Sequence, residues 1–377
     1  MAFSSWRTST LTRIRSLVHD IPKHARPGSP AQAMMRMDKR SFSVSSGVLS
    51  PSGYTDVVDL RSDTVTLPSQ KMLNSIFSAA IGDDVMGEDP TVLELERFMA
   101  EKFGKERGLF VPTGTMSNLV ALLSHCDKTR AAEIIIGSGS HINLWEGGNA
   151  SSIGGIHTRQ VEEDKESAQL HEDDILDCVR NGMDDHWPIT SLLCLENSHN
   201  MCGGVALPKS YFDKMSKLAH SEKMNNVNVH VDGARIFNAA VAQDIDVIDL
   251  CENVDSVSVC LSKGLGAPLG SVLVGNEDFI TVAKRARKRC GKKSLIFVST
   301  HTVVTNSIIA TLLLLSMTLF ITHFYVCHLL AGGGMRQAGV VASMGLFAVQ
   351  NNIDRLAEDH NRAKKVRYYN VVPSNSV

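Results

Sequence analysis

The chain has 377 residues, of which 43% are hydrophobic and 21% charged, enough for one large domain or two with a buried core. Its formal net charge of -2 gives no reason to expect nucleic-acid binding. Eight cysteines are scattered without CxxC pairs or metal-ligand spacing, which favours reduced thiols in an intracellular protein and indicates neither a disulfide framework nor a metal site.

The first 55 residues differ in composition from the rest of the chain. The stretch up to residue 48 is rich in Arg, Ser and Thr, has no apolar core like that of a secretory signal, and has Asp20 and Asp38 as its only acids. This composition is typical of a mitochondrial transit peptide, and a disordered leader without an address shares it. We therefore exclude residues 1–55 from the fold and expect an intracellular protein, mitochondrial or cytosolic.

Strand-like and helix-like stretches alternate through residues 56–291, which we take as the large domain. Helical spacing of apolar residues predicts helices at 116–126 and 211–224. Repeated strands between helices indicate an α/β fold with a mostly parallel sheet covered on both faces. Short apolar or alternating runs predict the strands at 108–112, 132–137, 189–197, 227–233, 255–264 and 270–275.

The pattern changes after a basic stretch, AKRARKRCG, that reads as the end of a helix. Residues 292–331 form an apolar insert, and 294–331 contain no Asp, Glu, Lys or Arg, which is long enough to span a bilayer. One interpretation is a membrane anchor. We favour a non-native segment such as translated intron sequence, because the insert splits a helix. Residues 332–377 resume globular composition and are interpreted as the end of the large domain with a truncated C-terminal region.

Lys263 is the first candidate catalytic residue. It lies in CLSKGLGAPLG, residues 260–270, where an alternating strand gives way to glycines and a proline. A lysine at a strand end can extend its ammonium into solvent. A partly desolvated amine can instead form a Schiff base, which suggests pyridoxal 5'-phosphate (PLP) as the cofactor.

PLP also needs backbone N–H donors for its phosphate, a carboxylate for its pyridine nitrogen and a flat partner for its ring. Gly114 and Thr115 follow a predicted strand and open a helix, as a phosphate site requires, although such turns are common. Asp232 ends an apolar strand, where a buried carboxylate needs a cationic partner; it could also cap the following helix. Arg235 could meet a carboxylate or the cofactor's phenolic oxygen.

His141 and His199 each come just after a predicted strand. A neutral imidazole could stack on the ring or accept a proton near neutral pH, whereas a lone loop histidine is more often satisfied by hydrogen bonds. Polar residues past several strand ends indicate one shared site, because ligands of open α/β sheets bind at the carboxyl ends of the strands.

Together these motifs resemble the low-specificity threonine aldolases, PLP enzymes of the aspartate-aminotransferase fold type (fold type I). The resemblance covers about residues 56–290 and 332–364, and it implies cleavage of L-threonine or L-allo-threonine to glycine and acetaldehyde. It is carried by DLRSDTVTLPSQKM, GDDVMGEDPTVLELE, PTGTMSNLVAL, HINLWEGG, LENSHNMCGG, HVDGARIFNAAVA, LSKGLGAPLGSVLVG and GGGMRQAG.

The resemblance implies roles for the cofactor-binding residues. Lys263 would carry the Schiff base, Asp232 would face the pyridine nitrogen, and His141 would stack on the ring. Gly114 and Thr115 would hold the phosphate.

It also implies the substrate contacts. Arg235 would contact the cofactor or the substrate carboxylate, Ser62 would help to bind that carboxylate, and His199 would lie near the substrate hydroxyl. Arg336 would reach a phosphate across a subunit interface, in a homodimer or homotetramer. The base that takes the hydroxyl proton stays open between His141, His199 and a water held by either.

The chain departs from the family pattern in two ways: the apolar insert, and the absence of a small C-terminal domain in which an arginine contacts the substrate carboxylate. One alternative is therefore a catalytically impaired, membrane-associated or misfolded splice variant. Membrane association through 294–331 is possible but not favoured. A second alternative is another fold-type-I PLP enzyme, an aminotransferase or a β-eliminating lyase.

Overall fold

The computed structural model describes residues 59–290 and 335–371, with side chains through residue 366. These residues belong to one unit of the chain, residues 59–377. The predicted leader at 1–55 lies outside the described residues, and so does the apolar insert at 292–331. Both interpretations of the insert therefore stay predictions.

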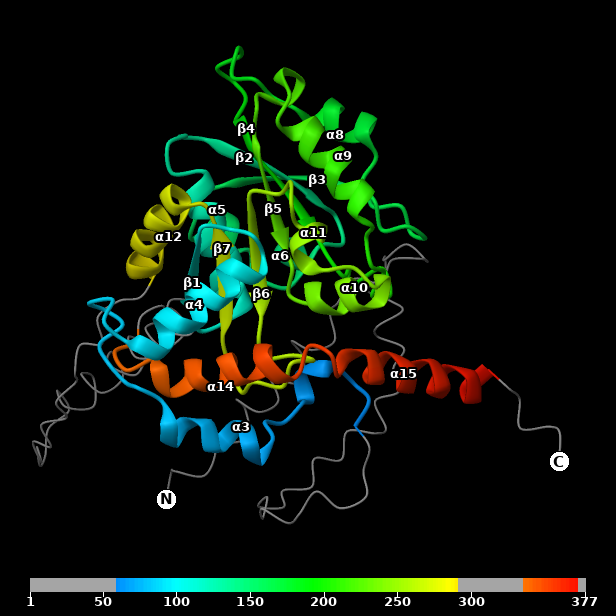
Figure 1. Cartoon of the computed structure of the whole chain (residues 1–377). Helices are drawn as coiled ribbons and strands as arrows, with labels where there is room; N and C mark the ends of the chain where they lie inside the picture. The colour runs from blue at the N-terminus through cyan, green and yellow to red at the C-terminus, as the bar shows by residue number, and fades with distance from the viewer. Residues whose placement is uncertain (1–58, 291–334, 372–377) are drawn as a thin grey trace, which may run out of the picture. The chain divides into compact units, whose positions relative to one another are not determined.

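A seven-stranded sheet forms the centre of the described chain, in the order β1-β7-β6-β5-β4-β2-β3 (Figure 1). β7 is antiparallel to its neighbours β1 and β6, and the other neighbouring pairs are parallel. This confirms the mostly parallel α/β sheet, and each predicted run overlaps one strand. The strands are β1 (Arg107–Val111), β2 (Ala132–Gly137), β3 (His157–Val161), β4 (Ile189–Glu196), β5 (Asn228–Asp232), β6 (Ser256–Cys260) and β7 (Ser271–Gly275).

Helices cover both faces of this sheet. The longer ones are α4 (Pro90–Lys102), α5 (Gly114–His125), α9 (Lys209–Ala219), α10 (Ile236–Gln243), α12 (Glu277–Cys290), α14 (Gly339–Asn351) and α15 (Leu356–Val371). The shorter ones are η2 (Asp63–Val65), α3 (Gln70–Asn74), η3 (Ser75–Ser78), α6 (His141–Leu144), α7 (Asn149–Ser152), α8 (Glu172–Cys178), η4 (Glu222–Met224) and α11 (Val247–Leu250). Within the described ranges, no helix is both long and apolar enough to cross a membrane.

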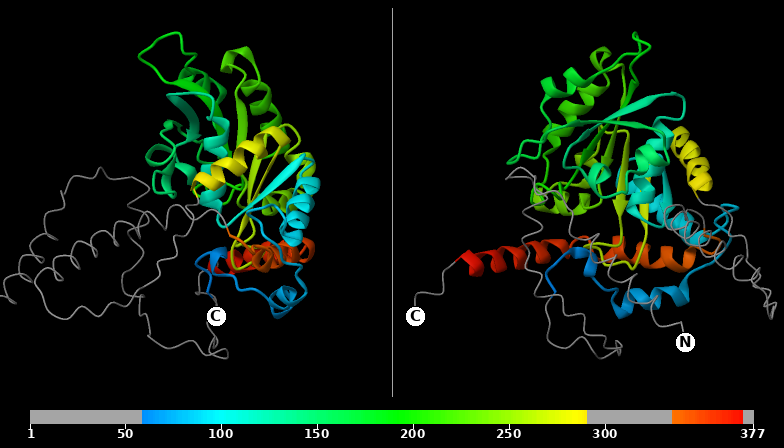
Figure 2. Two further views of the ribbon diagram at one scale, coloured as in Figure 1. Left: turned by 90° about the vertical axis from the view of Figure 1, so that its left-hand side faces the viewer. Right: turned by 180° about the vertical axis from the view of Figure 1, so that it is seen from behind.

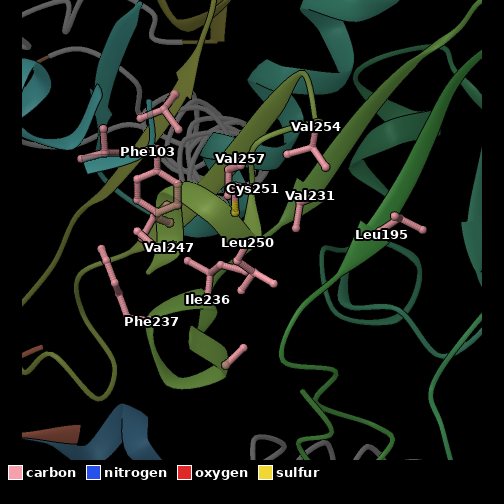
Figure 3. Packing of buried hydrophobic residues seen from close by; sticks show 14 of the residues in the cluster. Phe103, Leu195, Val231, Ile236, Phe237, Val247, Leu250, Cys251, Val254 and Val257 are labelled. Carbon is pink, nitrogen blue, oxygen red and sulfur yellow. The ribbon is translucent and has the colours of Figure 1, made fainter. Parts of the chain in front are cut away.

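Strand side chains alternate between two apolar layers, as a sheet buried on both faces requires. On β1, Phe110 joins the larger cluster with α4, α9 and α14, whereas Leu109 and Val111 join a smaller one under α5 and α12. Figure 3 shows part of the larger cluster, in which Phe103 lies near Phe237, with their ring centroids 5.5 Å apart.

The structure corrects two predicted boundaries. The helix expected at 211–224 ends at Ala219, because the Ser221 hydroxyl donates to the Leu218 carbonyl at 2.6 Å and diverts it from the helix. The strand expected at 255–264 ends at Cys260, so Lys263 lies in the following loop.

The edge strand β3 was not predicted. Its sequence, HTRQV, buries only Val161 fully, so it lacks the apolar pattern that revealed the inner strands.

One carboxylate ties the segment after residue 335 to the sheet domain. Asp89 Oδ1 accepts from Thr91 N at 3.1 Å and Val92 N at 3.2 Å, which caps α4. Its Oδ2 accepts from Gly82 N at 3.2 Å and from Gly339 N, at the start of α14, at 2.9 Å. α14 consequently lies beside α4 and α3 (Figures 1 and 2).

Candidate active site

The predicted site residues gather at the carboxyl ends of neighbouring strands. β4, β5 and β6 are adjacent and parallel, and Asp232 at the end of β5 is the register partner of Glu196 on β4 and Ser258 on β6. The loop with Lys263 follows β6, and α5 begins beside it, since a Cβ on Gly114 would approach Cys260 Sγ. The parallel topology therefore brings groups from distant segments to one edge.

Asp232 is buried, with 3% of its surface exposed. Its Oδ2 accepts from Asn118 Nδ2 at 2.9 Å and its Oδ1 from Ala234 N at 3.1 Å. α10 begins at Ile236 with Arg235 in the N-cap position, so the alternative that Asp232 caps this helix is wrong. The Asp232 carboxyl group is thus held at the strand end by two N–H donors.

Lys263 is half-buried in a loop that is fixed by its own carbonyl oxygen. That oxygen accepts from Thr66 Oγ1 at 2.7 Å and from Gly266 N at 2.8 Å. Within residues 59–290 and 335–366, no acceptor takes a hydrogen bond from its Nζ, so the amine is uncommitted while its backbone is anchored. Such an amine suits covalent attachment of a carbonyl compound.

Arg235 makes a bidentate pair with Asp63. Its Nε and Nη2 each lie 2.8 Å from a carboxylate oxygen of Asp63, and both side chains are largely buried. Burial alone would raise the pKa of Asp63, but Arg235 and the charge of Lys263 hold it below its ordinary value. Ser62, next to Asp63, is exposed, and its hydroxyl accepts from Thr64 N at 3.2 Å.

His141 opens α6 and is held by two glutamates. Its Nδ1 lies 3.0 Å from Glu146 Oε1, and its backbone N donates to Glu196 Oε2 at 2.6 Å. Ligand atoms of His141, Glu146 and Asp232 all lie within 4.8 Å of one another. The Glu146 hydrogen bond raises the pKa of His141, whereas burial raises that of Glu146.

His199 forms a second imidazole–carboxylate pair. Its Nε2 lies 3.0 Å from Glu163 Oε1, and both side chains are buried. Burial opposes the charged imidazole, but Glu163 and Glu196 outweigh it and raise the pKa of His199. Nδ1 of His199 and Oγ of Ser140 lack partners among the described residues, and both residues line a small cavity.

The start of α5 fits the predicted phosphate site. Thr113 is its N-cap, with Oγ1 accepting from Met116 N at 3.1 Å and its carbonyl oxygen from Ser117 N at 3.0 Å. The backbone N–H groups of Gly114 and Thr115 have no acceptor in the described part of the chain, so they could donate to an anion at this end of the helix. A Cβ on Gly114 would lie 2.6 Å from Cys260 Sγ, so only glycine fits this approach.

Arg336 is not brought to these residues within one chain. Its side chain is 77% exposed, and Nε lies 3.3 Å from Asp83 Oδ2. Its predicted reach to a phosphate in a second subunit stays a prediction.

Sequence reasoning missed several polar residues that hold the predicted ones. Glu146 and Glu163 pair with the histidines, Glu196 lies beside Asp232, and Asn118 bridges Asp232 Oδ2 and Glu146 Oε1 at 2.9 and 2.8 Å. Glu196 carried the same signal as Asp232, an acidic residue ending an apolar strand. Glu163 carried none, because its pairing with His199 depends on how loops meet in space.

Comparison with known proteins gives consistent matches. The beta-eliminating lyase family model matches residues 59–372. The chain is 42% identical over 308 residues to the probable low-specificity L-threonine aldolase 2 of Arabidopsis thaliana, covering 81% of this chain and 74% of that protein. It is 39% identical over 315 residues to the low specificity L-threonine aldolase of Escherichia coli K12, covering 81% and 77%.

Solved structures share the fold at lower identity. The Leishmania major threonine aldolase superposes with a TM-score of 0.59 at 16% identity, covering 81% of this chain and 77% of that one. A putative L-allo-threonine aldolase from Listeria monocytogenes gives 0.58 at 20% identity, covering 79% and 69%.

Proposed function

The chain belongs to the beta-eliminating lyase family and within it to the low-specificity L-threonine aldolases, and we propose that it cleaves L-threonine and L-allo-threonine to glycine and acetaldehyde with PLP as cofactor. The observation that carries the cofactor assignment is the meeting of Asp232, the Lys263 loop and the start of α5 at one edge of the sheet.

The residues present fit PLP. Gly114 and Thr115 offer backbone N–H donors to a phosphate, and the buried Asp232 offers a carboxylate to a protonated ring nitrogen. Lys263 offers an amine for covalent attachment. When bound, PLP supplies an electron sink for the pair released as the Cα–Cβ bond of the substrate breaks.

Arg235 and Ser62 are our candidates for binding the substrate carboxylate. Arg235 commits Nε and Nη2 to Asp63, which fixes the plane of the guanidinium. Because guanidinium has five N–H donors, the group can hold Asp63 and still offer donors to a second carboxylate. Asp63 then acts as the orienting partner of Arg235.

Either imidazole pair could accept the β-hydroxyl proton of the substrate. Both His141 and His199 have carboxylate partners that raise their pKa and stabilise the imidazolium formed on proton uptake. His199 has one ring nitrogen without a partner among the described residues, next to a small cavity lined also by Ser140. This favours His199, or a water that it holds there, as the acceptor.

We also propose that the enzyme works as a homo-oligomer. Several large apolar side chains in the segment that precedes α4 are exposed, with exposed fractions of 69% for Leu60, 63% for Leu67, 90% for Phe77 and 71% for Met86. Exposed apolar surface of this kind suits burial against a second copy of the chain. Arg336, exposed beside this segment, would then reach the phosphate site of that copy.

Product analysis tests the proposed reaction. The purified chain with PLP and L-threonine should release glycine and acetaldehyde in equal amounts, and Lys263→Ala should release neither and form no borohydride-reducible adduct with PLP. Lys165→Ala, at an exposed lysine, is the matched control. Formation of a keto acid, or an adduct of unchanged yield in Lys263→Ala, would contradict the proposal.

A further inference from the structure

A strip of polar side chains crosses the sheet beneath α5. Val229 and Val231 of β5 belong to the larger apolar cluster, so His230 between them faces the opposite side. Ser256 of β6 is the register partner of His230, and both are fully buried, each with 0% exposure. Buried polar groups are costly unless they are hydrogen-bonded, so their partners have to be accounted for.

These side chains form an unbroken hydrogen-bond chain that ends at Asp232. Asn228 Nδ2 lies 3.2 Å from His125 Nδ1, and His125 Nε2 lies 2.8 Å from Ser256 Oγ. Ser256 Oγ lies 2.9 Å from His230 Nδ1, and His230 Nε2 lies 3.2 Å from Asn118 Oδ1. Asn118 Nδ2 then donates to Asp232 Oδ2 at 2.9 Å.

The carboxylate end of the chain fixes the direction of every link. An ionised carboxylate only accepts, so Asn118 must present its NH₂ to Asp232 and its oxygen to His230. His230 must therefore carry its proton on Nε2, and its Nδ1 accepts from the Ser256 hydroxyl. That hydroxyl has one proton, so it accepts from His125 Nε2–H, and His125 Nδ1 accepts from the exposed Asn228. His125, Ser256 and His230 each donate once and accept once in this chain, while Asn118 accepts from His230 and donates to both Asp232 and Glu146.

The surroundings keep both histidines neutral. Burial lowers the pKa of His230 to about 4, and burial together with His230 lowers the pKa of His125 to about 3. The His125 ring is also stacked on Phe279, with centroids 4.4 Å apart. These two imidazoles thus differ from His141 and His199, whose carboxylate partners raise their pKa.

We propose that His230 is a positioning residue for Asp232 and acts through Asn118. If the Asn118 amide turned over, its oxygen would face the carboxylates of Asp232 and Glu146, and a proton would have to be taken up there. The Nε2–H of His230 opposes that turn because it needs the amide oxygen as acceptor. His230 thereby keeps a donor on Asp232, which stays anionic toward the ring nitrogen of PLP; this consequence rests on the proposed function.

Nuclear magnetic resonance on the cofactor-free protein tests the chain itself. With ¹⁵N-labelled histidine, both His125 and His230 should show the Nε2–H tautomer and should stay neutral from about pH 8 to about pH 5.5. The histidine signal that disappears in His230→Gln belongs to His230, and the one that disappears in His125→Gln belongs to His125. A Nδ1–H tautomer at His230, or its protonation in this range, would overturn the proposal whatever the reaction of the enzyme.

A matched pair of variants tests the effect on Asp232. His230→Gln places an amide donor near the former Nε2 and should keep PLP affinity within about threefold, whereas His230→Asn ends near the former Nδ1, leaves Asn118 without its donor and should weaken PLP binding about tenfold. His186→Asn, at an exposed histidine, should match the wild type. Equal affinities in His230→Gln and His230→Asn would overturn the positioning role.

The same measurement of PLP affinity, made on one more variant, separates this inference from the proposed function. If Asp232→Asn leaves PLP binding unchanged, Asp232 is not the partner of the ring nitrogen, and the tautomers still report on the hydrogen-bond chain alone. Thermal unfolding of both His230 variants without PLP shows whether a loss of affinity merely follows a loss of folding, and in that case the tautomer measurement decides.

Discussion

Glu196 and Asp232 are register partners on the neighbouring strands β4 and β5, and both carboxyl groups are buried. Burial first and the charge of Asp232 second raise the pKa of Glu196. Its two oxygens nevertheless accept from the backbone N–H groups of His141 at 2.6 Å and Asn200 at 2.9 Å. The strand ends therefore bring two buried carboxyl groups together at the place where we expect a protonated ring nitrogen to bind.

Asp232→Asn should leave the chain folded but remove the charge that keeps this nitrogen protonated. We expect kcat to fall about 100-fold to 1000-fold, the size of effect that follows loss of one preorganised electrostatic group. Steady-state acetaldehyde release measures it, with Asp249→Asn, at an exposed aspartate, as the control. Turnover close to that of the wild type would show that Asp232 has only a structural role.

Glu163→Gln should destabilise the protein more at low pH than at high pH. The folded pKa of His199 is raised above its ordinary value, so the pair's contribution is fully present below about pH 6.5 and is lost as pH rises through the folded pKa. Chemical denaturation at about pH 6 and about pH 8.5 measures the difference, and Glu166→Gln, at an exposed position, should show none. A pH-independent loss would mean that His199 is not charged by this pair.

Gly114→Ala should destabilise the protein although alanine is the better helix former. The new Cβ would lie 2.6 Å from Cys260 Sγ, and such overpacking costs about 1–3 kcal/mol. Cys260→Ala in the same chain should restore most of the loss, because it removes the clashing sulfur. Thermal unfolding measures all three variants, and a double variant no more stable than Gly114→Ala would refute the steric explanation.

Removing residues 292–331 should give a chain that is more soluble and binds at least as much PLP. The contacts that hold α14 in place, such as Asp89 to Gly339 at 2.9 Å, come from residues outside that stretch, and its removal takes away a long apolar sequence. Membrane fractionation and the PLP content per chain compare the two forms. A full-length chain found in membranes and fully loaded with PLP would instead support the anchor interpretation.

The sequence was sufficient to place the sheet and the site residues that end its inner strands. Buried parallel strands are largely apolar, as in AEIIIG, so a carboxylate that ends such a strand, as Asp232 ends β5, stands out. The supporting residues could not be found in this way. Asn118 lies on a helix among apolar residues, and His230 lies inside a strand, so either could be an isolated buried polar group until the fold brings them within 3.2 Å.

The double use of Asp89 also bears on the order in which the chain can assemble. Its Oδ1 caps α4 locally, but Gly339 N, which donates to Oδ2, lies 250 residues further along the chain. At a ribosomal rate of about 5–20 residues per second, Gly339 emerges about 10–50 s after α4. During that time the surface of α4 that α14 will cover stays open to solvent or to chaperones. α14 can therefore cover this side of the sheet only late in synthesis, after Gly339 has emerged and can donate to Asp89.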